Sequence, residues 1–161
     1  MSAIADVNFV FSVVSATDRT LALAGINPAN SAYSLSNWGA FPAIPLVYAG
    51  SNTAYNGNGN AANAFKVVEI SAFAFDSLTA FAATTMTPAF LPANLKRIGE
   101  RAFAGVKLQG SLTIPATLES VGFQAFYNTL INDIVIGSST NSSIVPHLAN
   151  LTSVINQEIT D

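Results

Sequence analysis

The fold is decided by thirteen residues, LPANLKRIGERAF from Leu91 to Phe103, which recur as IPATLESVGFQAF from Ile114 to Phe126. The offset between the copies is constant, since it is the same at the proline, aliphatic and final phenylalanine positions. Coincidence is a poor explanation for agreement at three kinds of position. A fixed internal period indicates a repeat architecture, in which each copy is one structural unit.

Weaker copies of the same pattern lie upstream. One is VEISAFAF at residues 68–75, where the spacing from Ile70 to Ile98 exceeds that from Ile98 to Val121 because a longer connection intervenes. An earlier partial copy begins at Ile44. A period of about 20 to 29 residues is that of a leucine-rich repeat, in which every repeat adds a short strand and a return segment to a shared core. The sequence therefore predicts a β-rich solenoid with a period of about 23 residues and few or short helices.

The strands of the repeats can be placed from their alternation. Residues 112–114 and 134–136 carry apolar side chains two apart, which is the period of a strand with one buried face. We therefore expect Leu112 and Ile114 to point into the core, and Ser111 and Thr113 to point out of it.

The segment Ile-Gly-x-x-Ala-Phe is the second apolar element of each repeat. Its glycine is expected to adopt a positive φ at a corner, and its alanine leaves room for the phenylalanine ring to pack against the next layer. We expect Phe75, Phe103 and Phe126 to stack as a ladder in the core, and not to line a ligand site.

The two ends of the chain differ from the repeats. Residues 9–14 and 20–26 are apolar runs on either side of a polar turn, which predicts a β-hairpin. A hairpin laid across the first coil would cover the apolar layer and the strand edges that a solenoid otherwise exposes. Near the other end, residues 144–155 have helical spacing while residues 151–155 also fit a strand, so we expect a short helix and then a closing strand.

A chain of 161 residues is long enough for one domain, since domains hold roughly 100 to 200 residues. We expect a single leucine-rich repeat domain over residues 1–161. The N-terminal hairpin cap and first strand would occupy residues 1–43, the repeats residues 44–137, and the C-terminal cap residues 138–161.

The run Leu-x-x-Ile-Gly-x-x-Ala-Phe, followed by a short connection and Leu-x-Ile-Pro, resembles the BspA-like leucine-rich repeat family of microbial surface proteins. The resemblance covers residues 66–137 well and residues 9–48 loosely. Family repeats often place a cysteine three residues after the phenylalanine, where this chain has Leu78, Val106 and Thr129, and Gly137 stands where a proline is expected. The resemblance implies an extracellular or cell-surface module that binds host proteins or other cells, with no shared catalytic residues.

Composition argues against several classes of function. Only 9% of the residues are charged, against about 25% in an average soluble protein. With six basic residues and a net charge of −3, the chain has no basic field to neutralise the phosphates of a nucleic acid. No apolar run reaches the roughly 20 residues of a membrane-spanning helix, and no secretory signal is visible at the N-terminus. The absence of cysteine excludes disulfides and thiolate metal sites.

Residues that could carry catalysis are scarce. The one histidine, His147, lies next to Pro146 and is expected to be exposed or to cap a terminal helix. The nine acidic residues are scattered, and the repeat brings no two of them into register. The Asn/Gly-rich run at 51–63 contains no carboxylate for a hard cation. We expect no enzymatic activity, no cofactor and no bound metal.

Three groups of residues are candidates for binding a partner. The outward strand positions form a nearly uncharged face, and repeat proteins generally bind through such a face. The 51–63 run has the composition of an adaptable recognition loop, or of a plain flexible insertion. Basic residues gathered in one repeat form a positive patch for an anionic partner, unless they pair with Glu100, Glu119 or Glu69. The residues are Ser111, Thr113, Asp133 and Val135 on the face; Tyr55, Asn56 and Asn58 in the loop; and Lys96, Arg97 and Arg101, with Lys107, in the patch.

These observations favour a non-enzymatic recognition or adhesion module that binds a protein or a glycan through the strand face and the 51–63 loop. The alternative is a self-assembling structural subunit of a fibre, layer or oligomer, because a surface with little charge opposes association weakly. Neither hypothesis involves nucleic acid or insertion into a membrane.

Overall fold

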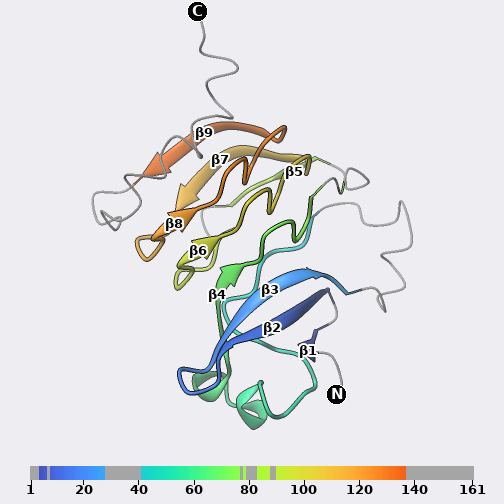
Figure 1. Cartoon of the computed structure of the whole chain (residues 1–161), viewed down its shortest axis with the longest axis vertical. Helices are drawn as coiled ribbons and strands as arrows, with labels where there is room; N and C mark the ends of the chain where they lie inside the picture. Colours follow the sequence, from blue (N-terminus) through green and yellow to red (C-terminus); the bar gives the residue numbers. More distant parts are fainter. Residues whose placement is uncertain are drawn as a thin grey trace, which may run out of the picture.

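The computed structural model describes residues 4–6, 8–27, 41–76, 78, 83–87 and 90–136. They form two sheets whose strands follow one another along the long axis of the molecule (Figure 1). The larger sheet has the order β1-β2-β3-β4-β6-β8 and the smaller one the order β5-β7-β9. The strands are β1 (Ile4–Ala5), β2 (Phe9–Ser15), β3 (Thr20–Ile26), β4 (Lys66–Ile70), β5 (Thr84–Thr85), β6 (Arg97–Ile98), β7 (Leu108–Ile114), β8 (Ser120–Val121) and β9 (Leu130–Ile136).

The repeat seen in the sequence gives parallel strand pairing in both sheets, with a register shift between Gly110 and Ser111 in the smaller one. In the larger sheet β4, β6 and β8 run parallel, with Ile70 opposite Ile98 and Ile98 opposite Val121. In the smaller sheet β7 and β9 run parallel with Leu112 opposite Ile134. The return segment thus carries a two-residue strand of its own, so these repeats contribute a strand to each sheet and not to one sheet only.

The outward and inward positions of β7 follow the predicted alternation. Leu112 and Ile114 are buried, while Ser111 is exposed and Thr113 is half-buried. A period of two along a strand sends successive side chains to opposite faces, so one apolar face can close on the core.

The three phenylalanines of the Ala-Phe positions form the predicted core ladder. The ring centroids of Phe75 and Phe103 lie 5.3 Å apart, and those of Phe103 and Phe126 lie 5.2 Å apart with the planes only 6° from parallel. All three side chains are almost fully buried. The ladder continues into the N-terminal part of the chain, because the ring of Phe9 contacts that of Phe75 at 5.8 Å.

The glycines of the Ile-Gly positions are required for space, which corrects the expectation that they adopt a positive φ. A Cβ atom on Gly99 would lie 2.3 Å from the backbone nitrogen of Ala72, and one on Gly122 would lie 2.3 Å from that of Glu100. Glycine therefore lets the turn of one repeat approach the backbone of the repeat before it. The left-handed conformation falls two residues later, with φ of 59°, 50° and 54° at Phe73, Arg101 and Gln124.

The N-terminal hairpin forms as predicted but joins the repeats in a different way. Strands β2 and β3 pair antiparallel, and β3 then pairs parallel with β4, with Leu23 opposite Ile70. The backbone N–H of Ser71 also donates to the carbonyl oxygen of Leu23 at 2.9 Å. The hairpin therefore extends the sheet edge to edge and does not lie across the first coil, because the backbone of β3 pairs with that of β4.

The partial copy at residues 44–48 does not join the parallel strands. It contributes a single antiparallel bridge, between Val47 and Lys66. Ile44 and Tyr48 are nevertheless buried in the core, and the Tyr48 hydroxyl donates to the carbonyl oxygen of Ala5 at 2.6 Å. The segment thus packs against the repeats through its side chains.

The predicted C-terminal helix and closing strand, together with His147, lie outside the described residues. Within the part of the chain that is described, no helix has the length and apolar content needed to cross a membrane.

Candidate functional site

The four strand-face candidates lie together on two neighbouring strands. Ser111 pairs with Asp133 and Thr113 pairs with Val135 across β7 and β9. The Ser111 hydroxyl donates to the Asp133 carboxylate at 3.1 Å, which holds the one charged group of this set in place. Val135 is 43% exposed, so the face combines a small polar pair with an exposed apolar side chain.

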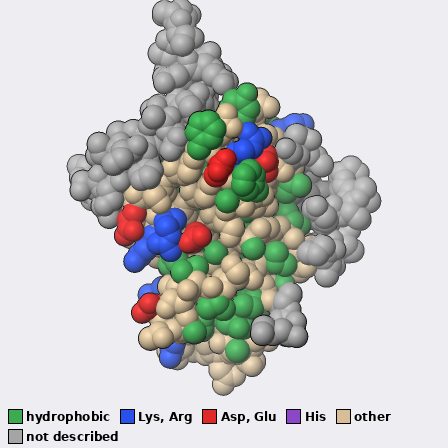
Figure 2. All heavy atoms as spheres, viewed as in Figure 1, with side chains coloured by type: hydrophobic (Ala, Val, Ile, Leu, Met, Phe, Trp, Pro, Cys, Tyr) green, Lys and Arg blue, Asp and Glu red, His purple; other side chains and the backbone are tan. Residues whose placement is uncertain are grey.

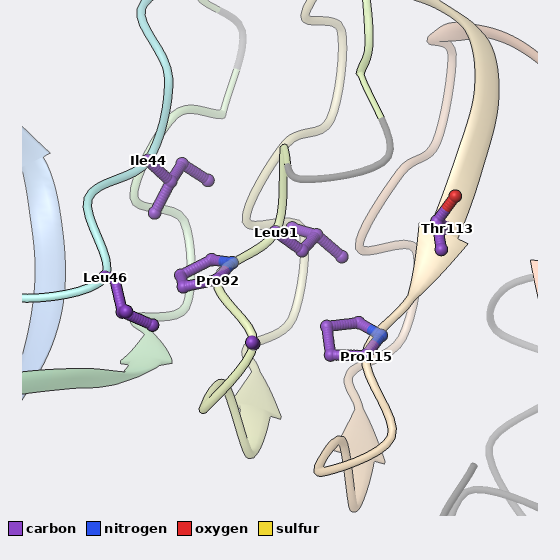
Figure 3. Close-up of a pocket in the computed structure, with 7 residues that line it drawn as sticks. Ile44, Leu46, Leu91, Pro92, Thr113 and Pro115 are labelled. Carbon is purple, nitrogen blue, oxygen red and sulfur yellow. The ribbon is translucent and has the colours of Figure 1, made fainter. Parts of the chain in front are cut away.

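An apolar groove of about 430 Å³ opens beside Thr113 (Figure 3). Its walls come from three places: the 41–50 segment, the start of the repeat at residues 91–93, and the end of β7 with the proline that follows. No charged side chain is among the described residues that line it, which are Ile44, Leu46, Leu91, Pro92, Ala93, Thr113 and Pro115. A volume of this size is within the roughly 300 to 1,000 Å³ of ligand pockets, and the apolar lining suits an uncharged, largely hydrophobic group.

Most of the groove was missed by sequence reasoning. Pro92 and Pro115 occupy the same position of successive repeats, and their recurrence was a signal that they share one side of the molecule. Leu46, which is 48% exposed, carries no such signal because its segment has no counterpart in register with the strong repeats.

The 51–63 run is more ordered than a plain flexible insertion. It contains two short 3₁₀ turns, Gly57–Gly59 (η2) and Ala61–Asn63 (η3). Tyr55 packs its ring edge-on against Phe65 at 5.0 Å, and the side chain of Asn56 donates to the carbonyl oxygen of Gly50 at 2.9 Å. Of the three candidates in this loop, Tyr55 and Asn56 therefore hold it in shape, and Asn58 is the exposed one.

Two of the basic candidates are paired with acids. Arg97 forms an ion pair with Glu69 at 2.8 Å, one of the partners that the sequence suggested. Arg101 pairs instead with Asp76, through Nε to Oδ2 and through a second guanidinium nitrogen to Oδ1, each at 3.1 Å. Lys96 is exposed. On the face shown in Figure 2, basic and acidic side chains accordingly lie next to one another.

Arg97→Gln is expected to change the free energy of unfolding by less than about 1 kcal/mol, because the ion pair is partly exposed and solvent screens it. The side chains of Arg97 and Glu69 are 40% and 31% exposed. Urea unfolding of Arg97→Gln and of Glu69→Gln, each compared with the wild type, would measure the change in the free energy of unfolding. A loss above roughly 2 kcal/mol in either variant, which is the scale for leaving a buried polar group unpaired, would contradict this expectation.

The Arg101 guanidinium is held by more than one neighbour. It donates to the side-chain oxygen of Gln124 at 2.8 Å, and its central carbon lies 5.9 Å from the centre of the Tyr127 ring. The hydrogen bonds to the Asp76 carboxylate raise the pKa of Arg101, so the guanidinium stays charged wherever the protein is folded.

The family described as "BspA type Leucine rich repeat region (6 copies)" matches residues 77–159, just over half of the chain. The chain belongs to this family. BspA-type leucine-rich repeat proteins are typically surface proteins of bacteria, and the repeat is generally a non-enzymatic fold that mediates protein interactions. The match runs on through residues 138–159, beyond the described part of the chain.

One solved structure resembles this BspA-type chain, a leucine-rich repeat protein from Bacteroides ovatus ATCC 8483. The two are 16% identical with a TM-score of 0.45. The alignment covers 84% of this chain and 38% of the other, so the chain spans well under half of that protein's length. No curated protein matches the sequence. Among the described residues, no group of three or more His, Asp or Glu side chains is placed to hold a metal ion.

Proposed function

We propose that this BspA-type chain is a non-enzymatic recognition or adhesion module of a cell surface, which binds a protein or glycan through the strand face of β7 and β9. The observation that carries the proposal is the groove of about 430 Å³ that opens beside Thr113. The groove is apolar and the face next to it carries the Ser111–Asp133 pair, so a hydrophobic group of a ligand could anchor while polar groups around it set orientation.

The organisation that supports this function is one solenoid domain over residues 1–161. We propose that residues 1–43, whose hairpin continues the larger sheet beyond the repeats, end the solenoid on one side, that residues 44–137 form the repeats, and that residues 138–161 close the second end. Capping of this kind keeps the end layers of a repeat array from associating. The exposed tip of the 51–63 loop at Asn58 is a second point of contact.

The role of the groove in binding can be tested by introducing a charged side chain into it. In Thr113→Arg, the guanidinium would stand in an apolar groove, and a ligand seated there would leave it unpaired. We expect binding to immobilised secreted proteins and glycans to weaken by about tenfold or more, which corresponds to about 1.4 kcal/mol. Surface plasmon resonance of the purified chain against such a panel would measure the affinity.

The matched control is Val13→Arg, which adds the same charge to an exposed position on β2. It is expected to leave binding unchanged. Equal affinities for the two variants, or no binding to any member of the panel, would contradict the proposal.

A self-assembling subunit is the second candidate, and the observation that favours it lies on β9. Three apolar side chains of this strand are exposed, Leu130, Val135 and Ile136, with exposed fractions of 50%, 43% and 44%. Light scattering across a concentration series separates the two functions. A stable 16.7 kDa monomer at high concentration would exclude self-assembly. Wild-type oligomers that dissociate in the Val135→Lys variant would establish it.

A further inference from the structure

Three aromatic side chains are exposed on the turns that connect the two sheets. Phe73 is 52%, Phe123 61% and Tyr127 37% exposed. The turns are stacked directly on one another, since the backbone N–H of Phe73 donates to the carbonyl oxygen of Glu100 at 2.8 Å and that of Arg101 donates to Phe123 at 3.0 Å. We call this surface the aromatic rim; it consists of Phe73, Asp76, Arg101, Phe123, Gln124 and Tyr127.

The repeat itself shows that the fold does not need the two phenylalanines. In the register Ile70–Ile98–Val121, the position of Phe73 is taken by Arg101 and Gln124 in the next repeats, with nearly the same φ. The position of Phe123 is taken by Ala72 and Glu100. One turn geometry therefore accepts polar or small residues at both places.

Phenylalanine is also a costly choice at these positions. Phe73 exposes 52% of its side chain to water, in a turn whose left-handed φ the next two repeats satisfy with the polar residues Arg101 and Gln124. Phe123 exposes more than half of its ring to water. Residues that are unnecessary for the fold and unfavourable in isolation indicate a surface that has a partner.

The polar part of the rim is rigid. Arg101 lies between the two phenylalanine turns, and its planar guanidinium is fixed by Asp76 and Gln124 and faces the ring of Tyr127. A flat group that donates hydrogen bonds, next to a tyrosine ring and between two turns that carry exposed phenylalanines, can recognise a ligand that has both apolar faces and hydroxyl groups.

The charge distribution of the aromatic rim favours a neutral ligand. Arg101 is the one cation of the rim, and its charge is compensated by the two oxygens of Asp76. Glu100 lies close enough to add to the negative potential around Arg101. An anionic ligand would therefore meet no uncompensated cation on the rim.

The small exposed area of the aromatic rim and the hydrogen bonds between its turn backbones favour a narrow, chain-like ligand that is not a protein. The three exposed aromatic portions sum to on the order of 300 Å², if each side chain presents roughly 200 Å², which is far below the roughly 800 Å² per partner of a standard protein interface. A peptide strand would need a free sheet edge for its main chain. Here the turn backbones bond to each other, as with the N–H of Phe75 and the carbonyl oxygen of Ala102 at 2.8 Å.

We infer that the aromatic rim is a binding site for a neutral oligosaccharide or polysaccharide, with the sugar rings stacked on Phe73 and Phe123 and their hydroxyls facing Arg101 and Gln124. The two phenylalanines belong to turns two repeats apart, about 10 Å, since neighbouring strands lie roughly 4.8 Å apart. That separation suits two linked sugar residues. The rim shares no residue with the groove at Thr113, so it extends the proposed recognition function to a second surface.

The test is affinity electrophoresis of the full chain in gels that contain soluble mannan, galactan, xylan or β-glucan. We expect at least one of these neutral polysaccharides to retard the protein. Phe73→Gln and Phe123→Ala install residues that the chain already carries at the equivalent turn positions, at Gln124 and Ala72, so both variants should keep the fold. Each is expected to weaken retardation about tenfold, because one aromatic stacking contact is lost.

One control and one comparison separate this inference from the function proposed for the groove. Val13→Arg should leave retardation by polysaccharide unchanged. If Thr113→Arg abolishes retardation while Phe73→Gln/Phe123→Ala does not, the polysaccharide binds in the groove and the inference is overturned. No retardation by any of the four polysaccharides would overturn the inference, and so would equal retardation of wild type and Phe73→Gln/Phe123→Ala. Oligomers of the wild type that this double variant converts to monomers in light scattering would also overturn it, because the rim would then be an interface between copies.

Discussion

Phe103→Ala is expected to lower the free energy of unfolding by about 4 kcal/mol, within the roughly 3 to 5 kcal/mol typical of deleting a buried phenylalanine ring. The ring is fully buried and lies between two others, with centroid distances of 5.3 Å to Phe75 and 5.2 Å to Phe126. Alanine would leave a cavity in the middle of the ladder, because the backbones on either side are bonded to each other and cannot collapse into it. Urea unfolding followed by circular dichroism measures the loss.

The matched control for Phe103→Ala is Phe123→Ala, which removes the same ring from a 61% exposed position of the next repeat. It is expected to change stability by no more than about 0.5 kcal/mol. Because domains unfold with only about 5 to 15 kcal/mol, the core variant should have a clearly lower urea midpoint. Similar midpoints for the two variants would mean that the ladder does not hold the repeats together.

Gly122→Ala is expected to destabilise the protein by about 3 kcal/mol, at the upper end of the range for adding a methyl group where there is no room. The new Cβ atom would lie 2.3 Å from the backbone nitrogen of Glu100 and 2.6 Å from the carbonyl carbon of Gly99. Both atoms belong to a stacked turn whose hydrogen bond, from the N–H of Gly122 to Ile98 at 2.7 Å, would have to lengthen. Thermal and urea unfolding would both report the change.

Ser71→Ala is the control for the glycine substitution, because Ser71 occupies the same repeat position and already carries a Cβ atom. Its neighbour on that side is β3 and not another turn, as the hydrogen bond from its N–H to Leu23 indicates. We expect a change within about 0.5 kcal/mol. A Gly122→Ala variant as stable as Ser71→Ala would show that the turns can separate at little cost.

The periodic parts of the fold were predictable, and the contacts of the non-periodic segments were not. The Phe ladder, the strands at residues 112–114 and 134–136 and the N-terminal hairpin are all confirmed. The role of the Ile-Gly glycines was predicted wrongly, because a sequence shows that glycine recurs without showing whether dihedral freedom or space demands it. Only the distance between stacked turns separates these two reasons.

The candidate surfaces were likewise predictable where they lie on the repeated strands, and unpredictable where they depend on an irregular loop or turn. The sequence identified Ser111, Thr113, Asp133 and Val135 as one face, because alternation along each of two stacked strands sends these residues outward. It did not predict that Tyr55 would pack against Phe65, or that Arg101 would pair with Asp76. Those contacts depend on how an irregular loop and a turn approach the repeats.

The sequence by itself determined the repeat unit and the phenylalanine positions that face the core, because an internal period transmits one local pattern to successive layers. Only the tertiary structure showed the apolar groove beside Thr113. Ile44 and Leu91 are far apart in the sequence, yet they line one groove because the 41–50 segment, which follows no period, folds back on the repeats. Such a contact is set by the burial of side chains from distant parts of the chain, and no local spacing encodes it.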